Sequence, residues 1–288
     1  MMKPIGFGAA ILIPILLSAQ QPEFQVNTAG FRSLNAAVRL LREKSGWLLS
    51  FEEPIWPSKS VGGPEVRVTE QGFQEEPPAP DQLRISIPSL RGPGTQSSAI
   101  AALLGAFNSQ NSAVSYKAEA LGDMTVLEAD TMSVSAGVRA PAKLILSTTI
   151  QIPTARRTPM EHLGALAEAL RQQTGIPVRV DTGLIGYDVS FTGKNGAFTQ
   201  AEDLLVNWGS PSQTARLALL DLLSRSKTTT LYQVDCQAGV NSAGECILSL
   251  SPLMVEVVGR SGALKRKTLY FDRGRPDVAL PPDLPDPK

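Results

Sequence analysis

The residues with reactive side chains are few and widely spaced. His162 is the only histidine of the chain, and Cys236 and Cys246 are its only cysteines. A histidine-dependent triad would need His162, and no G-x-S-x-G motif marks a nucleophile for it. A lone histidine beside a helix start predicts a solvated or helix-end residue rather than a ligand or a base. The sequence therefore indicates no catalytic residue, no metal site and no cofactor.

The two cysteines flank a turn-rich run between two strand-like stretches. Their spacing is too long for a redox pair, which is usually C-x-x-C, and no histidine accompanies them to complete a zinc site. In an oxidising compartment, Cys236 and Cys246 are expected to form a disulfide across a hairpin. The alternative is two free thiols.

Adjacent carboxylates occur at Glu52-Glu53 and at Glu75-Glu76. Paired catalytic carboxylates come from separate structural elements, so adjacency does not identify them. Both pairs are interpreted as solvated surface residues in loops.

Tryptophan gives the best indication of a binding surface. Trp56 follows Ile55 in a proline-rich loop, where it could be an exposed anchor for a partner or fold back over the core. Aromatic residues in such loops also stack on sugars. The candidate partner-binding residues are Trp56, Ile55 and Trp208.

The elements that position these residues occur twice. The stretch from Glu161 to Gly175 predicts an amphipathic helix whose buried face repeats at i, i+3, i+4 and i+7. Gly175 can take the left-handed conformation that ends a helix. The same pattern ends at Gly46, which lies 129 residues earlier. The two stripes are Leu163, Leu166, Ala167 and Leu170, and Leu34, Ala37, Val38 and Leu41.

A second helix also recurs, at an offset of 116 residues. Its stripe is Ile100, Leu103, Leu104 and Phe107 in the first copy, and Arg216, Leu219, Leu220 and Leu223 in the second. Ser210, followed by Pro211 and Gln213, is expected to cap the later helix, and a short helix is expected from Thr199 to Asn207. The pattern predicts an α+β protein of two tandem small modules, each a short mixed sheet with two helices on one face.

The predicted organisation follows from these repeats and from composition. The domains are a signal peptide at 1–20, a first module at 24–130, a joint at 131–142, a second module at 143–260, and a terminal strand with a disordered, proline-rich tail at 261–288. The signal is indicated by Lys3 and a short apolar run, with an uncleaved anchor as the alternative. A net charge of zero, from 27 basic and 27 acidic residues, argues against a nucleic-acid partner.

The order of these elements resembles the short N-terminal (STN) domain of secretins and TonB-dependent transducers. The resemblance is carried mostly by residues 150–180, IQIPTARRTPMEHLGALAEALRQQTGIPVRV, with Pro211 to Tyr232 matching the second helix and the next strand. It is looser for the first copy, LNAAVRLLREKSGWLLSF. Members of that family are periplasmic docking modules, so the resemblance implies binding to another envelope protein. The resemblance supplies no catalytic residue.

Three functions remain open from the sequence. The preferred hypothesis is an exported, periplasmic or secreted, non-catalytic protein that binds another envelope protein through sheet edges or the loop around Trp56. The alternative is a cell-wall or carbohydrate-binding protein that uses exposed tryptophans. Less favoured is a hydrolase whose carboxylate site the sequence does not reveal.

Overall fold

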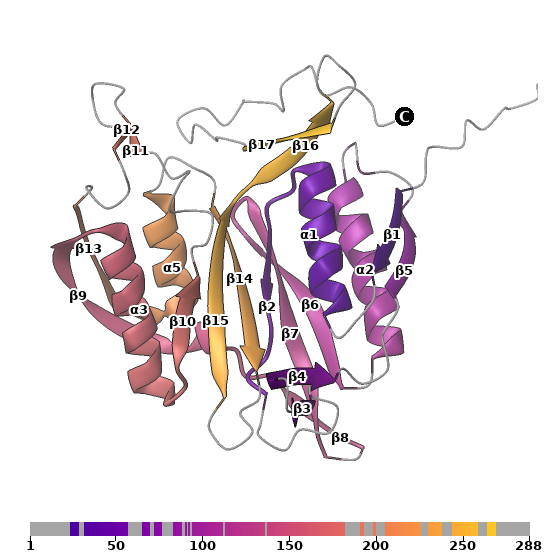
Figure 1. Cartoon of the computed structure of the whole chain (residues 1–288), viewed down its shortest axis with the longest axis horizontal. Helices are drawn as coiled ribbons and strands as arrows, with labels where there is room; N and C mark the ends of the chain where they lie inside the picture. Colours follow the sequence, from indigo (N-terminus) through magenta and orange to yellow (C-terminus); the bar gives the residue numbers. More distant parts are fainter. Residues whose placement is uncertain are drawn as a thin grey trace, which may run out of the picture.

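The structure is a computed structural model (Figure 1). It describes residues 24–28, 32–56, 65–69, 72–76, 83–87, 90, 92, 94–111, 113–135, 137–181, 191–192, 198–199, 205–225, 230–237, 244–258 and 264–268. The predicted signal peptide and the tail from residue 269 lie outside the described residues. The mixed α+β class is confirmed.

Two helices end at the predicted glycines. Helix α1 (Ser33–Ser45) is followed by Gly46 at φ 74°, and α3 (Pro159–Thr174) by Gly175 at φ 72°. Each glycine amide bonds back to a carbonyl of the last turn, which a residue with a Cβ could do only under strain. Every member of both predicted apolar stripes is buried, so these helix faces are confirmed.

The second pair of helices is α2 (Thr95–Gln110) and α5 (Ala215–Ser224). The predicted start of α5 at Ser210 is wrong, because residues 206–214 form strand β13 (Val206–Thr214) instead. That strand pairs with β9 (Thr149–Arg157). The pairing provides hydrogen bonds for main-chain groups that would otherwise have been bonded within a helix. Thr214 caps α5 by accepting a hydrogen bond from the Leu217 amide. The helix expected from Thr199 to Asn207 is contradicted wherever it is described, since Thr199 belongs to β12, Leu205 is not helical and residues 206–207 belong to β13. Residues 200–204 lie outside the described residues.

A seven-stranded sheet runs through the middle of the molecule (Figure 1). Its order is β10-β15-β14-β2-β7-β6, and β8 pairs with the far end of β7. The pairs β10–β15, β14–β2 and β2–β7 are parallel, whereas β14–β15, β6–β7 and β7–β8 are antiparallel. The strands are β2 (Leu49–Glu52), β6 (Val114–Leu121), β7 (Met124–Ser135), β8 (Val138–Pro141), β10 (Val178–Asp181), β14 (Thr230–Gln237) and β15 (Glu245–Pro252).

The sequence predicted two helices on one face of each small sheet, and the structure adds a further layer of outer strands beyond the helices. Helices α1 and α2 contact the two-stranded sheet of β1 (Phe24–Thr28) and β5 (Leu83–Ile87) on one side and the central sheet on the other. Helix α3 is held in the same way between β9–β13 and β10, and α5 packs against β13. Apolar residues of the outer strands explain the extra layer, since Val26, Leu83, Ile87, Ile150 and Ile152 are all buried.

The remaining elements are short. They are the 3-10 helix η1 (Ile145–Ser147) and three small hairpins: β3 (Glu65–Thr69) with β4 (Gly72–Glu76), β11 (Phe191–Thr192) with β12 (Phe198–Thr199), and β16 (Met254–Val258) with β17 (Leu264–Thr268). None of the described helices combines the length and the apolar character that a membrane crossing requires.

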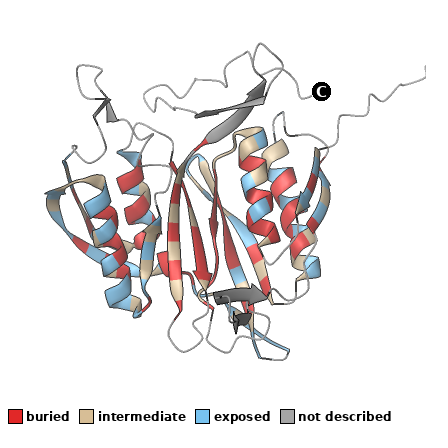
Figure 2. Ribbon diagram, in the orientation of Figure 1, coloured by how far each residue is buried: buried red, intermediate tan, exposed pale blue. Residues whose placement is uncertain are grey.

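The element order of the first half (residues 24–141) recurs in the second half (residues 149–252). Each half reads outer strand, helix, central strand, small hairpin, outer strand, helix and central hairpin, with the same pairings. The two halves are not separate, because β14 pairs with β2 and one cluster of buried apolar side chains runs through both (Figure 2). The segment predicted as a joint, 131–142, is mostly strand, the end of β7 and β8.

Gly209 provides a test of the packing between β9 and β13. A Cβ at this position would lie 2.5 Å from the Thr154 Cα and nitrogen, at a break in the strand register. We expect Gly209→Ala to lower the free energy of unfolding by about 1–3 kcal/mol, because the backbone must shift to relieve the overlap. The measurement is denaturant unfolding followed by circular dichroism.

Gly164 is the matched control, since a Cβ there meets open space in the middle of α3. Gly164→Ala should raise the free energy of unfolding by roughly 0.5–1 kcal/mol. Equal effects of the two alanines would show that Gly209 is not required by a close backbone approach.

Candidate functional site

The two halves meet where β14 and β2 run parallel. Gln233 lies beside Phe51, and Val234 lies beside Glu52. Successive residues of a strand point to opposite faces of the sheet. Phe51 points to the face covered by α2, since it stacks on Tyr116 at 5.2 Å and Tyr116 contacts Phe107 of that helix. Glu52 therefore points to the opposite face.

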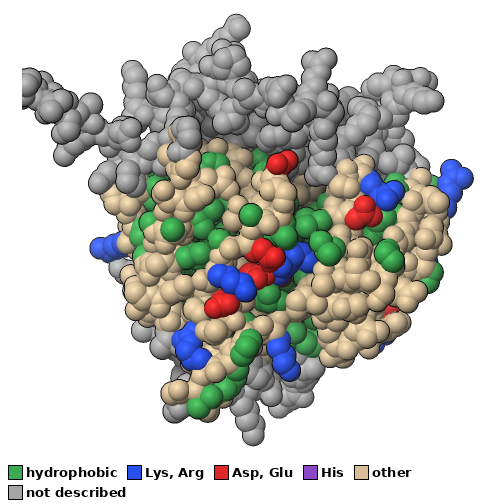
Figure 3. Space-filling view, turned by 180° about the vertical axis from the view of Figure 1, so that it is seen from behind, with side chains coloured by type: hydrophobic (Ala, Val, Ile, Leu, Met, Phe, Trp, Pro, Cys, Tyr) green, Lys and Arg blue, Asp and Glu red, His purple; other side chains and the backbone are tan. Residues whose placement is uncertain are grey.

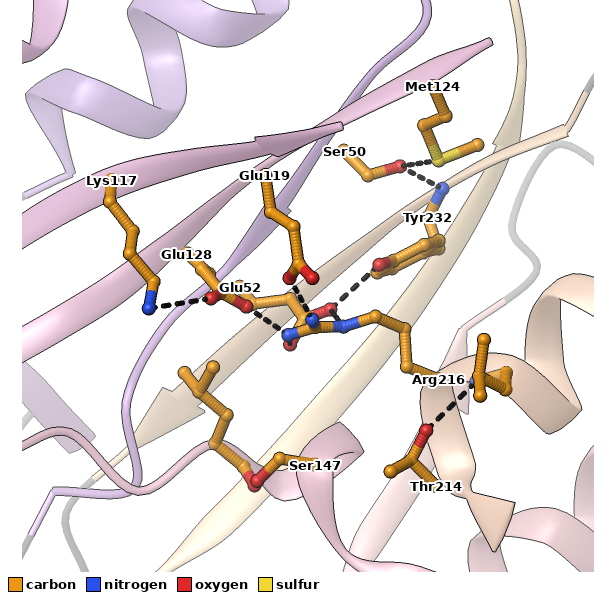
Figure 4. A network of polar contacts seen from close by, with 12 residues as sticks. Ser50, Glu52, Lys117, Glu119, Met124, Glu128, Ser147, Thr214, Arg216 and Tyr232 are labelled. Carbon is orange, nitrogen blue, oxygen red and sulfur yellow. Dashed lines mark hydrogen bonds and ion pairs between the residues drawn. The ribbon is translucent and has the colours of Figure 1, made fainter. Parts of the chain in front are cut away.

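Arg216 of α5 meets Glu52 on that opposite face. Its Nε and a terminal nitrogen donate to the two oxygens of Glu52 at 2.7 and 2.8 Å. It also donates to Glu119 at 2.7 Å and to Glu128 (Figure 4). The planar guanidinium suits this task because it has five donors in a fixed plane. One arginine of the second half thus binds three carboxylates of the first half.

Tyr232 completes what we call the junction cluster: Glu52, Glu119, Glu128, Arg216 and Tyr232. Its hydroxyl donates to Glu52 at 2.7 Å. Burial raises the pKa of Tyr232 well above its ordinary value, and the charge of Glu52 adds to this, so the hydroxyl stays a donor. Burial also raises the pKa of Glu52, although the hydrogen bonds and charge of Arg216 oppose the shift. Burial lowers the pKa of Arg216, but Glu52 outweighs it and the net direction is upward.

The junction cluster reaches the surface through Lys117. Its ammonium lies 3.4 Å from Glu128 and 3.3 Å from Asp130, and more than half of this side chain is exposed. Figure 3 shows acidic and basic side chains gathered at the centre of the face seen from behind. Four carboxylates thus face two cations; Glu52, Glu128 and Arg216 are buried, whereas the other members are partly exposed.

A second polar group lies on the other face of the junction. Glu53 accepts from Arg32 at 3.1 and 3.4 Å and from the Cys236 amide at 3.0 Å. Asp235 accepts from Asn35 at 2.9 Å and lies 3.9 Å from Arg32. Burial raises the pKa of Glu53 to about 8, helped by the charge of Asp235 and opposed by Arg32. Both faces of the junction are therefore bridged by carboxylates and arginines.

This arrangement is suited to joining rather than to turnover. Both oxygens of Glu52 are occupied by Arg216, and one of them also accepts from Tyr232. A carboxylate held by three donors is positioned to balance a buried guanidinium, not to attack or to deliver a proton. Within the described ranges, no group of three or more histidine, cysteine or acidic residues is arranged to hold a metal ion.

The predicted disulfide is confirmed. Cys236 and Cys246 are directly opposite each other on β14 and β15, with an S–S distance of 2.08 Å. Both are buried, and the Cys236 amide is the donor that binds Glu53. The disulfide thus lies beside the junction, which its place in the sequence did not reveal.

The structure does not give the predicted tryptophans the exposure of a binding surface. Trp56 is only 4% exposed, which corresponds to the alternative in which it folds back over the core, and Ile55 is half-buried. Trp208 is 1% exposed, and its indole nitrogen donates to Asp221 at 2.8 Å. The three candidates are also not brought together, since Ile55 and Trp56 follow β2 whereas Trp208 belongs to β13.

His162 lies near the start of α3, as the helix-end alternative predicted, but it is buried, so the solvated alternative is wrong. Its Nε2 lies 2.8 Å from the Val206 carbonyl, and its ring meets Trp208 edge-on at 5.1 Å. The reason is the outer sheet β9–β13, which covers a part of α3 that the apolar stripe alone leaves open. His162 and Trp208 therefore act as packing residues between α3 and β13.

The interpretation of Glu52-Glu53 as solvated loop residues is also wrong. Glu52 ends β2 and is 1% exposed, and Glu53 follows it at 3%. A signal for this was present in the repeat: Arg216 occupies the stripe position that Ile100 holds in the first copy. An arginine on an otherwise apolar helix face indicates a buried acidic partner. Glu75 and Glu76 belong to β4, and their side chains lie outside the described set.

Comparison with known proteins does not assign the chain to a family. No family model, no curated protein and no solved structure matches it significantly.

Arg216 tests the cohesion of the junction. Arg216→Met keeps the aliphatic packing but leaves Glu52 as a buried carboxylate without its cation and leaves Glu128 with Lys117 alone. We expect a loss of about 3–5 kcal/mol in the free energy of unfolding. Additional Glu52→Gln and Glu128→Gln substitutions should restore part of this loss, because the buried charges are then removed. Denaturant titration of Arg216→Met, alone and combined with the glutamine substitutions, measures both effects.

The control for Arg216 is Arg171→Met. Arg171 pairs with Glu168 on the exposed face of α3. Exposed pairs of this kind contribute about 0–1 kcal/mol. A loss at Arg216 no larger than the loss at Arg171 would contradict the role given to the junction cluster.

Glu53 predicts a dependence of stability on pH. The pKa of Glu53 in the folded chain is about 8, above its ordinary value of 4.5. Between these two pH values the folded state keeps the carboxyl proton, whereas the unfolded state has released it. This contribution to stability is fully present below about pH 4.5 and is lost as the pH rises through 8. Glu53→Gln removes the titrating group, so the difference in unfolding free energy between wild type and variant should change across this window. Parallel stability curves from pH 4.5 to 8 would exclude the shift.

Proposed function

We propose that the chain is an exported, non-catalytic docking protein built from two copies of an STN-like module, and that it binds another envelope protein. The resemblance of residues 150–180 to the STN pattern supports this, as does the recurrence of one element order in the two halves. The disulfide between Cys236 and Cys246 is compatible with an oxidising compartment outside the cytoplasm.

The observation that carries the proposal is the pairing of β14 with β2. Here one unit of the fold binds another by adding a strand to the edge of its sheet, and side chains such as Arg216 secure the contact. Main-chain pairing supplies affinity in strand addition, whereas the side chains around it supply specificity. A fold that joins its own halves in this way is suited to docking other chains by the same means.

The alternatives have less support. Carbohydrate binding was expected to use exposed tryptophans, and Trp56 and Trp208 are both buried. A hydrolase would need a carboxylate available to a substrate, and Glu52 is instead held by Arg216 and Tyr232. The ion pairs of the junction therefore favour a binding protein over an enzyme.

A crosslinking pull-down from envelope extract tests the proposed function, with the chain from residue 21 as bait. We expect one protein to be captured reproducibly and to be displaced by an excess of unlabelled bait. Leu166→Asp is the control bait, because it places a charge in the core of the second half and should unfold it. Retention on peptidoglycan or polysaccharide without a captured protein would contradict docking and favour the carbohydrate hypothesis.

A further inference from the structure

Strand β10 occupies the position in the second half that β2 occupies in the first. Val178 lies 129 residues after Leu49, the same offset that separates the glycines ending α3 and α1. On one side, β2 pairs in parallel with β7, and β10 pairs in parallel with β15. The two strands are thus equivalent in their helix, their neighbour and their direction.

The other side of β2 shows how such an edge is filled. Strand β14 lies against it in parallel, and the Glu53 amide donates to the Val234 carbonyl at 3.0 Å. Arg42 of α1 lies beneath this contact and donates to the carbonyls of Leu49 and Tyr232. Arg42 therefore links the edge strand to the strand that is added to it.

The other side of β10 is the end of the central sheet in the described part of the chain. The Cys246 amide donates to the Pro177 carbonyl, so residue 177 points its main-chain groups toward β15. In a parallel ladder every second residue does so, and the N–H and C=O groups of Val178 and Val180 therefore point away from β15. Arg171 stands at the position of Arg42, at the same offset of 129 residues. It pairs with Glu168 on the surface instead, and more than half of its side chain is exposed.

A second copy of this chain does not fit the edge. Its matching strand would be β6, where Asn108 already binds both main-chain groups of Tyr116, at 2.8 and 2.9 Å. In the second half, the equivalent Tyr232 offers the same groups to Ser50 and Arg42 across the junction. The first half also has Ile100 where the second half has Arg216, so β6 lacks the arginine that secures β14.

We propose that β10 is the docking edge for an extended segment of the partner protein, added parallel to β10 and alternating apolar and polar residues as β14 does. On binding, Arg171 leaves Glu168 and donates to a main-chain carbonyl of the incoming strand, as Arg42 does to Tyr232. This inference rests on the proposed docking function and assigns its site and the form of its partner.

The probe is a peptide with the sequence of residues 230–237, in which Cys236 is replaced by serine. It is added to the isotope-labelled chain from residue 21, and amide hydrogen exchange is followed by nuclear magnetic resonance. We expect the exchange of Val178 and Val180 to slow severalfold as the peptide saturates, with the same amino acids in scrambled order giving no protection. Arg171→Met should weaken peptide binding without changing the fold.

Two proline variants locate the binding edge. Val180→Pro removes an outward amide from β10 without breaking its ladder to β15, and should abolish the protection of Val178. Ala118→Pro makes the matched change on the outer side of β6 and should leave peptide binding unchanged. Circular dichroism of both variants checks that the fold is retained.

Three results would overturn the proposal. They are peptide protection that maps elsewhere, peptide binding that survives Val180→Pro, and concentration-dependent protection of β10 without peptide, which would make a second copy the occupant. If the pull-down captures a partner that Val180→Pro still binds, docking stands and β10 is not its site. If no partner is captured, docking itself fails, whatever the peptide does.

Discussion

The ion pair between Arg216 and Glu52 is the interaction on which the arrangement of the two halves depends. Removing both charges from water costs several kcal/mol for each ion, and this is recovered only where geometry and further hydrogen bonds are good. Arg216 meets that condition by binding Glu52 through two nitrogens and by reaching two further carboxylates. Since Arg216 and Glu52 come from different halves, the pair holds only when β14 lies in register against β2.

The same junction is secured from both faces of the sheet. Glu52 and Glu53 are neighbours in sequence and point in opposite directions, so each meets its own arginine. Arg216 of the second half serves Glu52, and Arg32 of the first half serves Glu53. The Cys236 amide also binds Glu53, which places the disulfide-bonded hairpin in the same contact. The two halves are therefore one continuous structure rather than domains on a flexible linker.

The sequence predicted what depends on neighbours along the chain. Apolar stripes and closing glycines identified α1 and α3, and the cysteine spacing identified the hairpin of β14 and β15. It did not predict which strands pair between the halves, because alternation fixes the face of a strand and not its partner. Glu52 shows the limit most clearly, since its partner Arg216 is 164 residues away. Adjacent charges are typical of surfaces, and only that distant arginine makes this site a buried one.

The two edge strands of the central sheet, β6 and β10, differ, and the difference affects where another strand can pair. An open edge strand invites pairing with other chains unless it is blocked. On β6, Asn108 copies the bonds of a neighbouring strand at Tyr116 and so prevents the sheet from extending there. No described strand pairs beyond β10, and Arg171 there is bound only to a nearby surface glutamate. Asn108 thus occupies the outer edge at Tyr116, whereas β10 keeps an arginine at the position of Arg42, and this difference favours growth of the sheet at β10 rather than at β6.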